Sequence, residues 1–483
     1  MWVASLLVAL LVAQAACVRP LVVRVHTAEA LDLLDAEPTV RRSVTPGVVL
    51  ADRQTWNALR ARTGLRQGED FDLEMPEKEV RRMLRDSVYA SNADLQTAVG
   101  ATMDIGAGLK VALLPGPAPR VDKPSLALIA NIHGDEVVSR EIARRFVDEL
   151  HGAMAHLLHD VDVWVLPTMN PTGFDRRQRY NAANKDLNRC FANRCGTRFV
   201  RGAVDGPLDV RGEYEDSVGI VQWVEMCSAT SAPEMAAVRA WLEAVGPTAV
   251  VSLHGGAEVV SIPMDCSCTQ PTGRVNETGR DYALHHEWGR AYAAANPRIR
   301  NSRLFPGGVI VGAAWYQLRG GLQDWALLGV NRTCASITIE VSNVKWPPYD
   351  DVANLYWPAV RHGMRALVEK VAQGVRGRIL DTNGDVVPNG VLYVEQLGGP
   401  VPTGPVNHVP VRGGVPVTTH PGTGWFFRML PEGVAHLIAA GAGHVAHRYS
   451  VTITNGRSLL LEARLEPLPA HLRAQAGELP YVE

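Results

Sequence analysis

The fold is decided by the stretch Leu126-Ala-Leu-Ile-Ala-Asn-Ile-His133-Gly-Asp-Glu136-Val-Val-Ser-Arg-Glu-Ile-Ala-Arg-Arg-Phe-Val-Asp-Glu-Leu150. Its first part, residues 126–132, is an apolar run of the length of a buried strand. After Gly134 the apolar residues return with a helical period. They are Val138, Ile142, Phe146 and Leu150. A buried strand that turns directly into an amphipathic helix is the building unit of α/β domains.

His133 and Glu136 lie in the polar turn between this strand and this helix. Open α/β sheets place their ligands at the carboxyl ends of parallel strands. The i, i+3 spacing lets an imidazole and a carboxylate converge on one metal ion. With 15 histidines in the chain, a chance match is also expected. Two interpretations are therefore open for the pair alone, a metal site or a helix-start carboxylate beside a turn histidine.

The composition indicates a globular protein of two or three domains. The chain has 483 residues, of which 46% are hydrophobic and 20% are charged. Its 48 basic and 50 acidic residues nearly cancel, so no basic field points to nucleic acid. Residues 1–16 are almost wholly apolar and end near a small-x-small site at Ala13-Gln14-Ala15, which predicts a signal peptide and a secreted protein. No later apolar run is long enough for a transmembrane segment.

The cysteines fit an exported protein but do not reveal their pairing. Beyond Cys17 there are six, and six cysteines allow 15 pairings. They are Cys190, Cys195, Cys227, Cys266, Cys268 and Cys334. No second Cys or His pair lies near the Cys-x-Cys at 266–268, which favours disulfides or thiols over a metal site there. Sequons at Asn276 and Asn331 predict glycosylation if the host glycosylates exported proteins.

Further strands and helices alternate along the chain as far as residue 372. Strands are expected at Val161–Leu166, Thr248–Leu253 and Ser336–Ser342, with two more short strands within 95–114. Helices are expected from Pro76, over Pro233–Val245 and Tyr282–Ala294, and from about Val352 to Val371. This order predicts an α/β domain with a mixed, mostly parallel sheet and helices on both faces. Glu340, at the centre of a β-branched strand, is either exposed on an edge strand or buried with a partner.

The pattern changes at Gly374, where short strands follow one another without helices. They are expected at Val375–Leu380, Val391–Leu397, Val411–Thr418, Gly424–Leu430, Val434–Ala440, Tyr449–Thr454 and Ser458–Leu465. Pro416 makes the third an edge strand at best. Regular short strands separated by turns predict a small all-β sandwich. The expected organisation is a signal peptide (1–16), a pro-like extension (17–70), a catalytic domain (71–372), the sandwich (373–466) and a tail (467–483).

The buried strands bring His133 with Glu136, His254 and Glu340 to their ends or faces. Two histidines and one carboxylate, with a fourth position left for water, form an open catalytic zinc site. A further carboxylate, Glu340, can take a proton from that water.

Other polar residues complete this constellation. Arg179 can stabilise an oxyanion at an attacked carbonyl. Asn188 and Arg189 offer the forked recognition that a free carboxylate requires. Tyr316 lies in a Gly-flanked loop that can close over a substrate.

These motifs resemble those of the zinc metallocarboxypeptidases, specifically the regulatory branch that includes carboxypeptidases N, E, M and D. They occur in the family order and cover about 71–372. The matching segments are Asn131–Glu136, Asn170–Gly173, Asp186–Arg189, Leu253–Gly256, Gly312–Tyr316, Gly320–Trp325 and Ile337–Ser342. The region after Gly374 resembles the transthyretin-like domain of the same branch.

The resemblance implies one zinc ion per chain, bound by His133, Glu136 and His254. It implies that Glu340 is the general base and acid and that Arg179 polarises the scissile carbonyl. The terminal carboxylate of a substrate would be bound by Asn188, Arg189 and Tyr316. Asp265 and Gln323 match positions of a pocket for a C-terminal Lys or Arg.

The sequence also departs from the pattern of the family. Asp135 replaces the usual Asn within the metal motif, and Cys190 replaces the Asn after Arg189, with no Pro after Phe191. Ser261-Ile262 stands where Asn-Tyr is usual, and the loop 193–230 and the Cys-x-Cys after Asp265 are unusual. None of these changes removes a catalytic group, but they affect pocket shape and substrate preference.

The leading hypothesis is a secreted, monomeric carboxypeptidase that removes a C-terminal residue, preferably Lys or Arg, from peptides or proteins. The main alternative is a weak or inactive peptide-binding member of the same family. The presence of the complete catalytic set favours the enzyme. A related amidohydrolase is a second alternative, but such relatives usually lack the Asn-Arg pair, the Tyr loop and the β-domain. A third alternative is that the β-domain is the functional part and serves adhesion, but it shows no exposed motif that supports this.

Overall fold

The structure is a computed structural model and describes residues 89–116, 123–192, 226–267, 270, 273–279, 281–328, 334–397 and 414–469, with the backbone of short strands elsewhere. The chain divides into two units, residues 1–91 with 347–355 and residues 92–346 with 356–483. In the first unit a four-stranded sheet has the order β2-β3-β1-β4. Its strands are β1 Leu21–Val25, β2 Arg41–Arg42, β3 Val48–Ala51 and β4 Phe71–Leu73.

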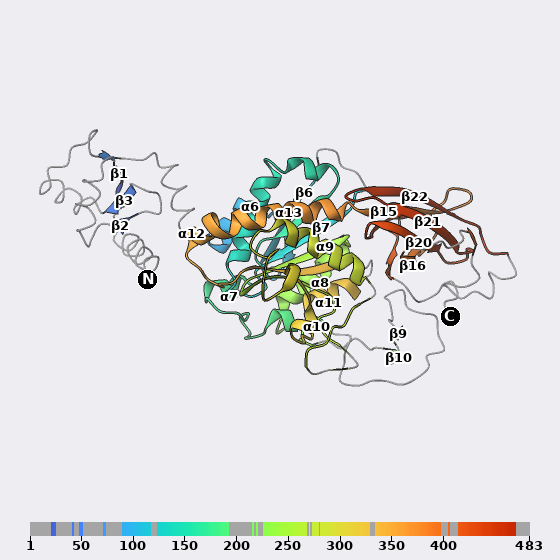
Figure 1. The fold of residues 1–483 in the computed structure, drawn as a ribbon, viewed down its shortest axis with the longest axis horizontal. Coiled ribbons are helices and arrows are strands. Elements are labelled where there is room, and N and C mark those ends of the chain that lie inside the picture. Colours follow the sequence, from blue (N-terminus) through green and yellow to red (C-terminus); the bar gives the residue numbers. More distant parts are fainter. Residues whose placement is uncertain are drawn as a thin grey trace, which may run out of the picture. The chain divides into compact units, whose positions relative to one another are not determined.

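An eight-stranded mixed sheet forms the centre of the second unit (Figure 1). Its order is β13-β12-β14-β11-β7-β8-β6-β5, and the neighbours β14, β11, β7 and β8 are mutually parallel. The strands are β5 Met103–Gly106, β6 Leu109–Leu114, β7 Ser125–Ala130, β8 Asp162–Leu166, β11 Ala249–His254, β12 Ala257–Ile262, β13 Val309–Val311 and β14 Ala335–Ser342. The predicted mixed, mostly parallel sheet is confirmed.

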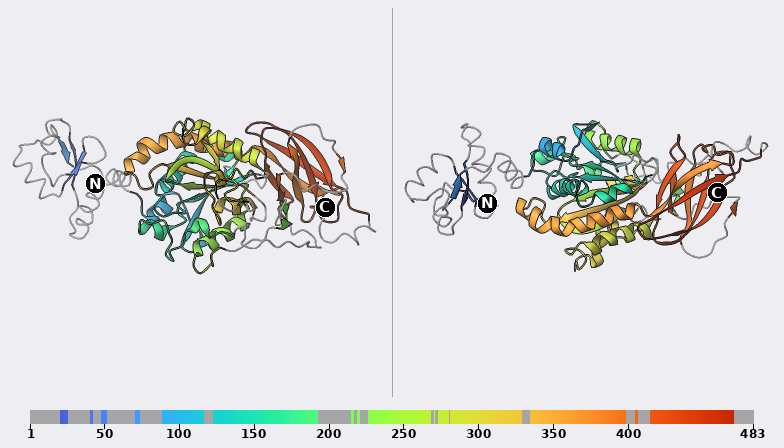
Figure 2. Two further views of the ribbon diagram at one scale, coloured as in Figure 1. Left: turned by 60° about the horizontal axis from the view of Figure 1, so that its bottom comes forward. Right: turned by 90° about the horizontal axis from the view of Figure 1, so that it is seen from above.

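Helices cover both faces of this sheet, as predicted (Figure 2). On one side α6 and α9 contact sheet strands and α13 packs on both helices. On the other side α8 and α11 pack in one apolar cluster with Ala127, Ile129 and Val250 from the central strands. The bounds are α6 Val138–Leu150, α8 Pro233–Val245, α9 Tyr282–Ala295, α11 Leu322–Leu328 and α13 Trp357–Val371.

The remaining helical segments are short. Among them, α5 was not predicted, and it begins before the two strands expected within 95–114. The segments are α5 Asn92–Ala98, α7 Pro171–Asp175, α10 Gly312–Trp315, α12 Tyr349–Asp351, the 3-10 turns η1 Ala155–His159, η2 Leu187–Arg189 and η3 Pro306–Gly308, and the π-helical η4 Val352–Tyr356. The single helix expected from Val352 to Val371 is therefore α13 preceded by a π-helical turn.

The register of the sheet brings the site residues together. His254, the last residue of β11, pairs with Glu340 on β14 in parallel register. One residue earlier, Leu253 pairs with Ala130 at the end of β7, from which the chain turns to His133. Because β14 lies between β12 and β11, the edge-strand alternative for Glu340 is wrong. The antiparallel strand β12, which was not predicted, covers what would have been that edge.

The region after Gly374 is a sandwich of two sheets, with orders β19-β15-β22 and β17-β21-β20-β16-β18 (Figure 1). Its core includes Val375, Leu392, Phe426 and Leu437. The expected edge position of the strand with Pro416 is confirmed, since β18 ends its sheet. The strands are β15 Gly374–Asp381, β16 Val391–Leu397, β17 Gly404–Pro405, β18 Gly414–Thr418, β19 Trp425–Met429, β20 Gly433–Ala440, β21 His447–Ile453 and β22 Ser458–Leu465.

A buried ion pair joins the sandwich to the α/β part. Arg428 on β19 donates to Asp281 at the start of α9, and both side chains are 5% exposed. The same carboxylate accepts from the backbone N–H of Val415. Breaking a buried pair of this kind by removing one partner typically costs about 3–5 kcal/mol.

Several expectations lie outside the described residues. These are the signal peptide, the helix from Pro76, the sequon at Asn331, Cys195 and Cys268 and most of the loop 193–230. The two-stranded sheet within that loop consists of β9 Glu215–Asp216 and β10 Gly219–Ile220. Among the described helices, none is long and apolar enough to cross a membrane.

Candidate metal centre and active site

A turn after β7 places His133 and Glu136 at the carboxyl end of the sheet. Asn131 adopts a left-handed conformation (φ 59°) and donates through Nδ2 to the backbone oxygen of His133 at 2.7 Å. A Cβ on Gly134 would lie 2.1 Å from the backbone of Gly173, so only glycine allows this close approach. The Asn170–Gly173 motif and the metal motif therefore pack backbone against backbone.

His133, Glu136 and His254 are buried, and their ligand atoms all lie within 4.8 Å of one another. The Nδ1 atoms of the two histidines are each 3.0 Å from a different oxygen of Glu136. The backbone N–H of Gly255 donates to Oε2 of the same carboxylate at 3.1 Å. Residues from two separate segments thus face one small volume.

The donor set fits a zinc ion. Asp186 accepts from Nε2 of His133 at 3.1 Å, and since an ionised carboxylate only accepts, that nitrogen carries the proton. Nδ1 of His133 faces an oxygen of Glu136 at 3.0 Å, and Nη1 of Arg179 lies 3.2 Å from the same nitrogen. The two imidazoles and the carboxylate bring atoms that can bind a metal ion within 4.8 Å of one another. Two imidazoles and one carboxylate, one imidazole being fixed by an outer carboxylate, are typical of catalytic zinc.

Glu340 is buried beside this cluster. Burial, and then the charge of Glu136, raise the pKa of Glu340 well above its usual range. Its Oε2 atom is buried and has no hydrogen-bond partner among the described residues. A carboxylate that binds protons readily and has one oxygen unused is suited to proton transfer.

Arg179 lies against the same cluster. Its Nε donates to Asp186 at 2.9 Å, and its Nη1 lies 3.4 Å from Oε1 of Glu136. Asn170 donates through Nδ2 to the backbone oxygen of Arg179 at 3.0 Å, which fixes the backbone at this residue. Although burial lowers the pKa of Arg179, the charges of Asp186 and Glu136 outweigh it, so the guanidinium is a permanent cation here.

One pocket contains most of the predicted site residues, and all except Arg189 and Gln323 line it. Arg189 is next to it, donating through Nη1 to the backbone oxygen of Asn188. Tyr316, at the end of α10, is 43% exposed at the wall of the pocket. The pocket is lined by His133, Glu136, Arg179, Asn188, His254, Ser261, Asp265, Gly312, Trp315, Tyr316, Leu318, Thr338 and Glu340.

Asp265 is a buried carboxylate in the lining of this pocket. Gln323 does not line the pocket but donates through Nε2 to Oδ1 of Asp265 at 2.8 Å. Burial, and then the charge of Asp324, raise the pKa of Asp265 well above its usual range. Oε1 of Gln323 is buried without a hydrogen-bond partner among the described residues. Asp265 and Gln323 therefore leave one buried acceptor oxygen unpaired beside the pocket.

Sequence reasoning missed three partners of these residues. Asp186 was part of a quoted motif but had no assigned role, although it binds both His133 and Arg179. Asp324 accepts from the backbone N–H of Asp265 through both carboxylate oxygens. Lys345 lies 3.0 Å from Glu136. Their charge, and their position within or next to the recognised motifs, were the signals in the sequence that could have identified these partners.

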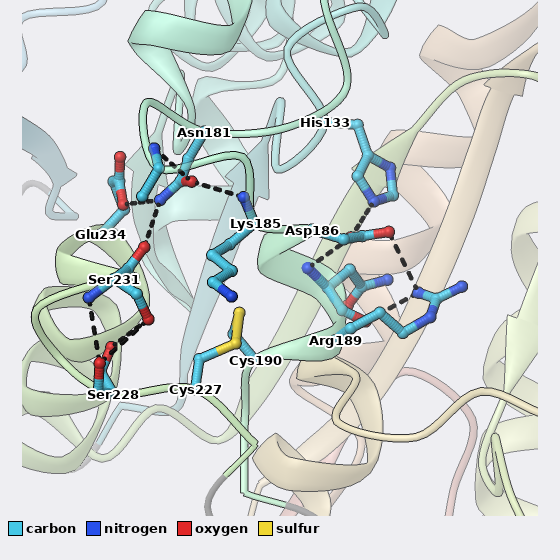
Figure 3. Close-up of a disulfide and its surroundings, with 12 residues drawn as sticks. His133, Asn181, Lys185, Asp186, Arg189, Cys190, Cys227, Ser228, Ser231 and Glu234 are labelled. Atoms are coloured by element: carbon cyan, nitrogen blue, oxygen red, sulfur yellow. Dashed lines mark hydrogen bonds and ion pairs between the residues drawn. A yellow bond between two sulfur atoms is a disulfide. The ribbon is translucent and has the colours of Figure 1, made fainter.

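A disulfide and a hydrogen-bonded asparagine fasten the segment 179–190 to the start of α8 (Figure 3). Cys190 is bonded to Cys227, 37 residues further along the chain. Asn181 donates to the backbone oxygen of Ser231 at 3.0 Å and to Glu234 at 2.9 Å. The expectation of disulfides is thus confirmed for this pair.

Two other cysteines remain as thiols. Cys266 and Cys334 are both buried and not disulfide-bonded. For Cys266 this is one of the two outcomes expected of the Cys-x-Cys.

The fold and the site together define an α/β metalloprotein with a His-Glu-His centre in the part of the chain that the structure describes. Residues 105–356 match the family model described as zinc carboxypeptidase. That range is more than half of the chain, which therefore belongs to the zinc carboxypeptidase family.

The chain is also similar to individual proteins. Carboxypeptidase M of Mus musculus is 30% identical over 310 residues, covering 59% of this chain and 62% of that protein. Carboxypeptidase Z of Homo sapiens is 29% identical over 352 residues, covering 67% of this chain and 49% of that protein. The chain therefore spans about half to three-fifths of the length of these relatives. A solved structure of bovine thrombin-activatable fibrinolysis inhibitor with tick carboxypeptidase inhibitor is 20% identical, with a TM-score of 0.44 over 59% of this chain and 98% of that one.

Proposed function

We propose that this protein is an active zinc carboxypeptidase that removes one residue from the C-terminus of peptides or proteins. The observation that carries the proposal is the common pocket of the His133–Glu136–His254 cluster and Glu340. The family assignment supports it. In this proposal residues 71–372 are the catalytic domain and residues 373–466 a transthyretin-like domain.

His133, Glu136 and His254 would hold one zinc ion, which supplies Lewis acidity and lowers the pKa of water to near neutrality. Glu340 takes the proton of the attacking water, since its pKa is raised and one of its oxygens is unused. It then returns a proton to the departing amine. Arg179 stabilises the negative charge that develops on the carbonyl oxygen of the substrate.

Asn188, Arg189 and Tyr316 bind the terminal carboxylate of the substrate, which restricts cleavage to the last peptide bond. Arg189 is 35% exposed in its side chain, so its guanidinium is accessible beside the pocket. Guanidinium groups match carboxylates in a bidentate geometry. Tyr316 follows the four-residue helix α10 and is partly exposed, which leaves its ring room to close over a substrate.

The substrate side chain enters towards Asp265, and a C-terminal Lys or Arg is preferred. A cation entering a closed pocket must lose water and needs a paired charge. Asp265 offers that charge, and the unpartnered Oε1 of Gln323 offers a neutral acceptor beside it. The raised pKa of Asp265 agrees with a carboxylate that lacks its cation in the free protein.

We further propose a secreted, glycosylated monomer that carries residues 1–16 as its signal peptide. The disulfide Cys190–Cys227 supports an oxidising compartment, since such bonds are rare in reducing ones. The pro-like role of residues 17–70 belongs to the same proposal.

The experiment is hydrolysis of blocked dipeptides ending in Arg, Lys, Phe or Glu, with and without a zinc chelator. We expect release of the last residue, fastest for Arg and Lys, and loss of activity with the chelator. Binding of these peptides without turnover in the zinc-loaded protein would instead identify an inactive peptide-binding member.

A further inference from the structure

The carboxylate of Glu136 is held by more than the two histidines. On Oε2 the backbone N–H of Gly255 donates at 3.1 Å. On Oε1 the ammonium group of Lys345 donates at 3.0 Å. Arg179 lies farther from Oε1, at 3.4 Å, and has a shorter bond to Asp186. Beside the proposed ligand His133, whose Nδ1 is also 3.0 Å away, Lys345 is therefore the side chain that most directly fixes this oxygen.

Lys345 is attached to the metal motif through both its backbone and its side chain. Its backbone oxygen accepts from the N–H of Val137 at 3.1 Å. Its ammonium group also lies 3.3 Å from Oδ2 of Asp135. A Cβ on Gly256 would lie 3.3 Å from Cε of Lys345, so the lysine stem passes close over this glycine. These contacts direct the ammonium group at Glu136.

We infer that Lys345 is a positioning residue for the metal-binding carboxylate and that Asp135 directs it there. The inference rests on the proposed zinc site. A carboxylate that binds a metal keeps its orientation through hydrogen bonds from outside the metal sphere. A bond between an ammonium and a carboxylate is among the stronger ones. Asp135 adds a second carboxylate oxygen at this ammonium group.

A purely electrostatic role would have the opposite consequence. If Lys345 only placed a positive charge near the centre, its removal would make the centre more negative, and zinc would bind more tightly. If Lys345 positions Glu136, its removal leaves the carboxylate free to turn, and zinc binds more weakly. The sign of the change in zinc affinity separates the two roles.

The experiment measures the zinc dissociation constant of the purified full chain by equilibrium competition with a chromophoric chelator. We expect Lys345→Met to weaken zinc binding by about 10–100-fold, as is usual for outer partners of metal ligands. Lys345→Arg should restore part of the affinity, and Asp135→Asn should fall between Lys345→Met and the wild type. The matched control is Lys110→Met on the exposed side of β6, which should leave the affinity unchanged.

Zinc binding by Lys345→Met as tight as in the wild type, or tighter, would overturn the inference. Thermal unfolding of the metal-free proteins identifies a variant that fails to fold. If Lys345→Met fails, Asp135→Asn, which keeps the lysine, must still show the weaker binding. A His133→Ala, His254→Ala variant that keeps its zinc would instead refute the metal site itself, so the two failures are distinguishable.

Discussion

Replacing Asp265 with Asn removes a negative charge from the pocket and almost nothing else. The residue is 6% exposed, and its Oδ1 accepts from Nε2 of Gln323 at 2.8 Å. An amide of the same shape keeps an acceptor for Gln323. The backbone N–H of the residue still donates to Asp324. The variant therefore tests the charge separately from the loop.

The size of the effect follows from the burial of the pair that Asp265 would form. Removing one partner of a buried, hydrogen-bonded charge pair costs about 2–5 kcal/mol. The raised pKa of Asp265 places the expected effect at the lower end, because part of the binding energy is used to ionise it. At about 1.4 kcal/mol per tenfold, a loss of about 2 kcal/mol is a ~30-fold lower kcat/KM for substrates ending in Arg or Lys.

The assay compares kcat/KM for otherwise identical peptides ending in Arg and Phe, over a range of pH. In the wild type the ratio of Arg to Phe should rise with pH, since the raised pKa of Asp265 leaves more of it protonated at low pH. In Asp265→Asn the ratio should be low and independent of pH. Equal losses on both substrates would show that Asp265 supports the loop, and the preference for basic residues would then be withdrawn.

Three further predictions concern zinc, turnover and the disulfide. A His133→Ala, His254→Ala variant should contain no stoichiometric zinc by metal analysis, and a full complement would refute the ligand assignment. Glu340→Gln should keep its zinc and fold but lose about 10²–10⁴-fold in kcat, whereas more than about a tenth of wild-type turnover would point to another base. Cys227→Ser should raise KM several-fold with little change in kcat, because it loosens the segment after Arg189 but leaves Glu340 in the sheet. A lower kcat with an unchanged KM in steady-state kinetics would contradict this.

The parts of the fold predicted well from the sequence are those with one dominant periodicity. Helix α8 was predicted with its exact bounds, since Pro233 begins it and Gly246 follows it. Strand β12 was missed because it directly follows Gly255-Gly256 and contains Glu258 and Ser261, which hide its alternation. That omission left the position of Glu340 open. Neighbours in a sheet come from different parts of the chain, so local pattern alone does not place a strand at an edge or in the centre.

The site residues also divide into those that a local sequence pattern predicts and those that depend on the tertiary structure. Residues within recognised motifs were predicted to converge, and the pocket brings most of them together. The pairing of Cys190 with Cys227 was not predictable, because it depends on which loops the fold brings together. The role of Lys345 was not visible either. It depends on one ammonium group reaching back across the turn to Asp135 and Glu136.

The disulfide between Cys190 and Cys227 also closes the chain between them into a covalent loop. The two Cα atoms are 4.7 Å apart, so the two ends of this loop are held together covalently. One of these ends, Cys190, immediately follows Arg189, beside the pocket. Substitutions or changes of length between Cys190 and Cys227 need not separate the two ends of the loop. This closed loop is thus a place where evolution, or a protein engineer, can introduce new recognition sequence. The geometry of Asn188 and Arg189 at the pocket would be preserved.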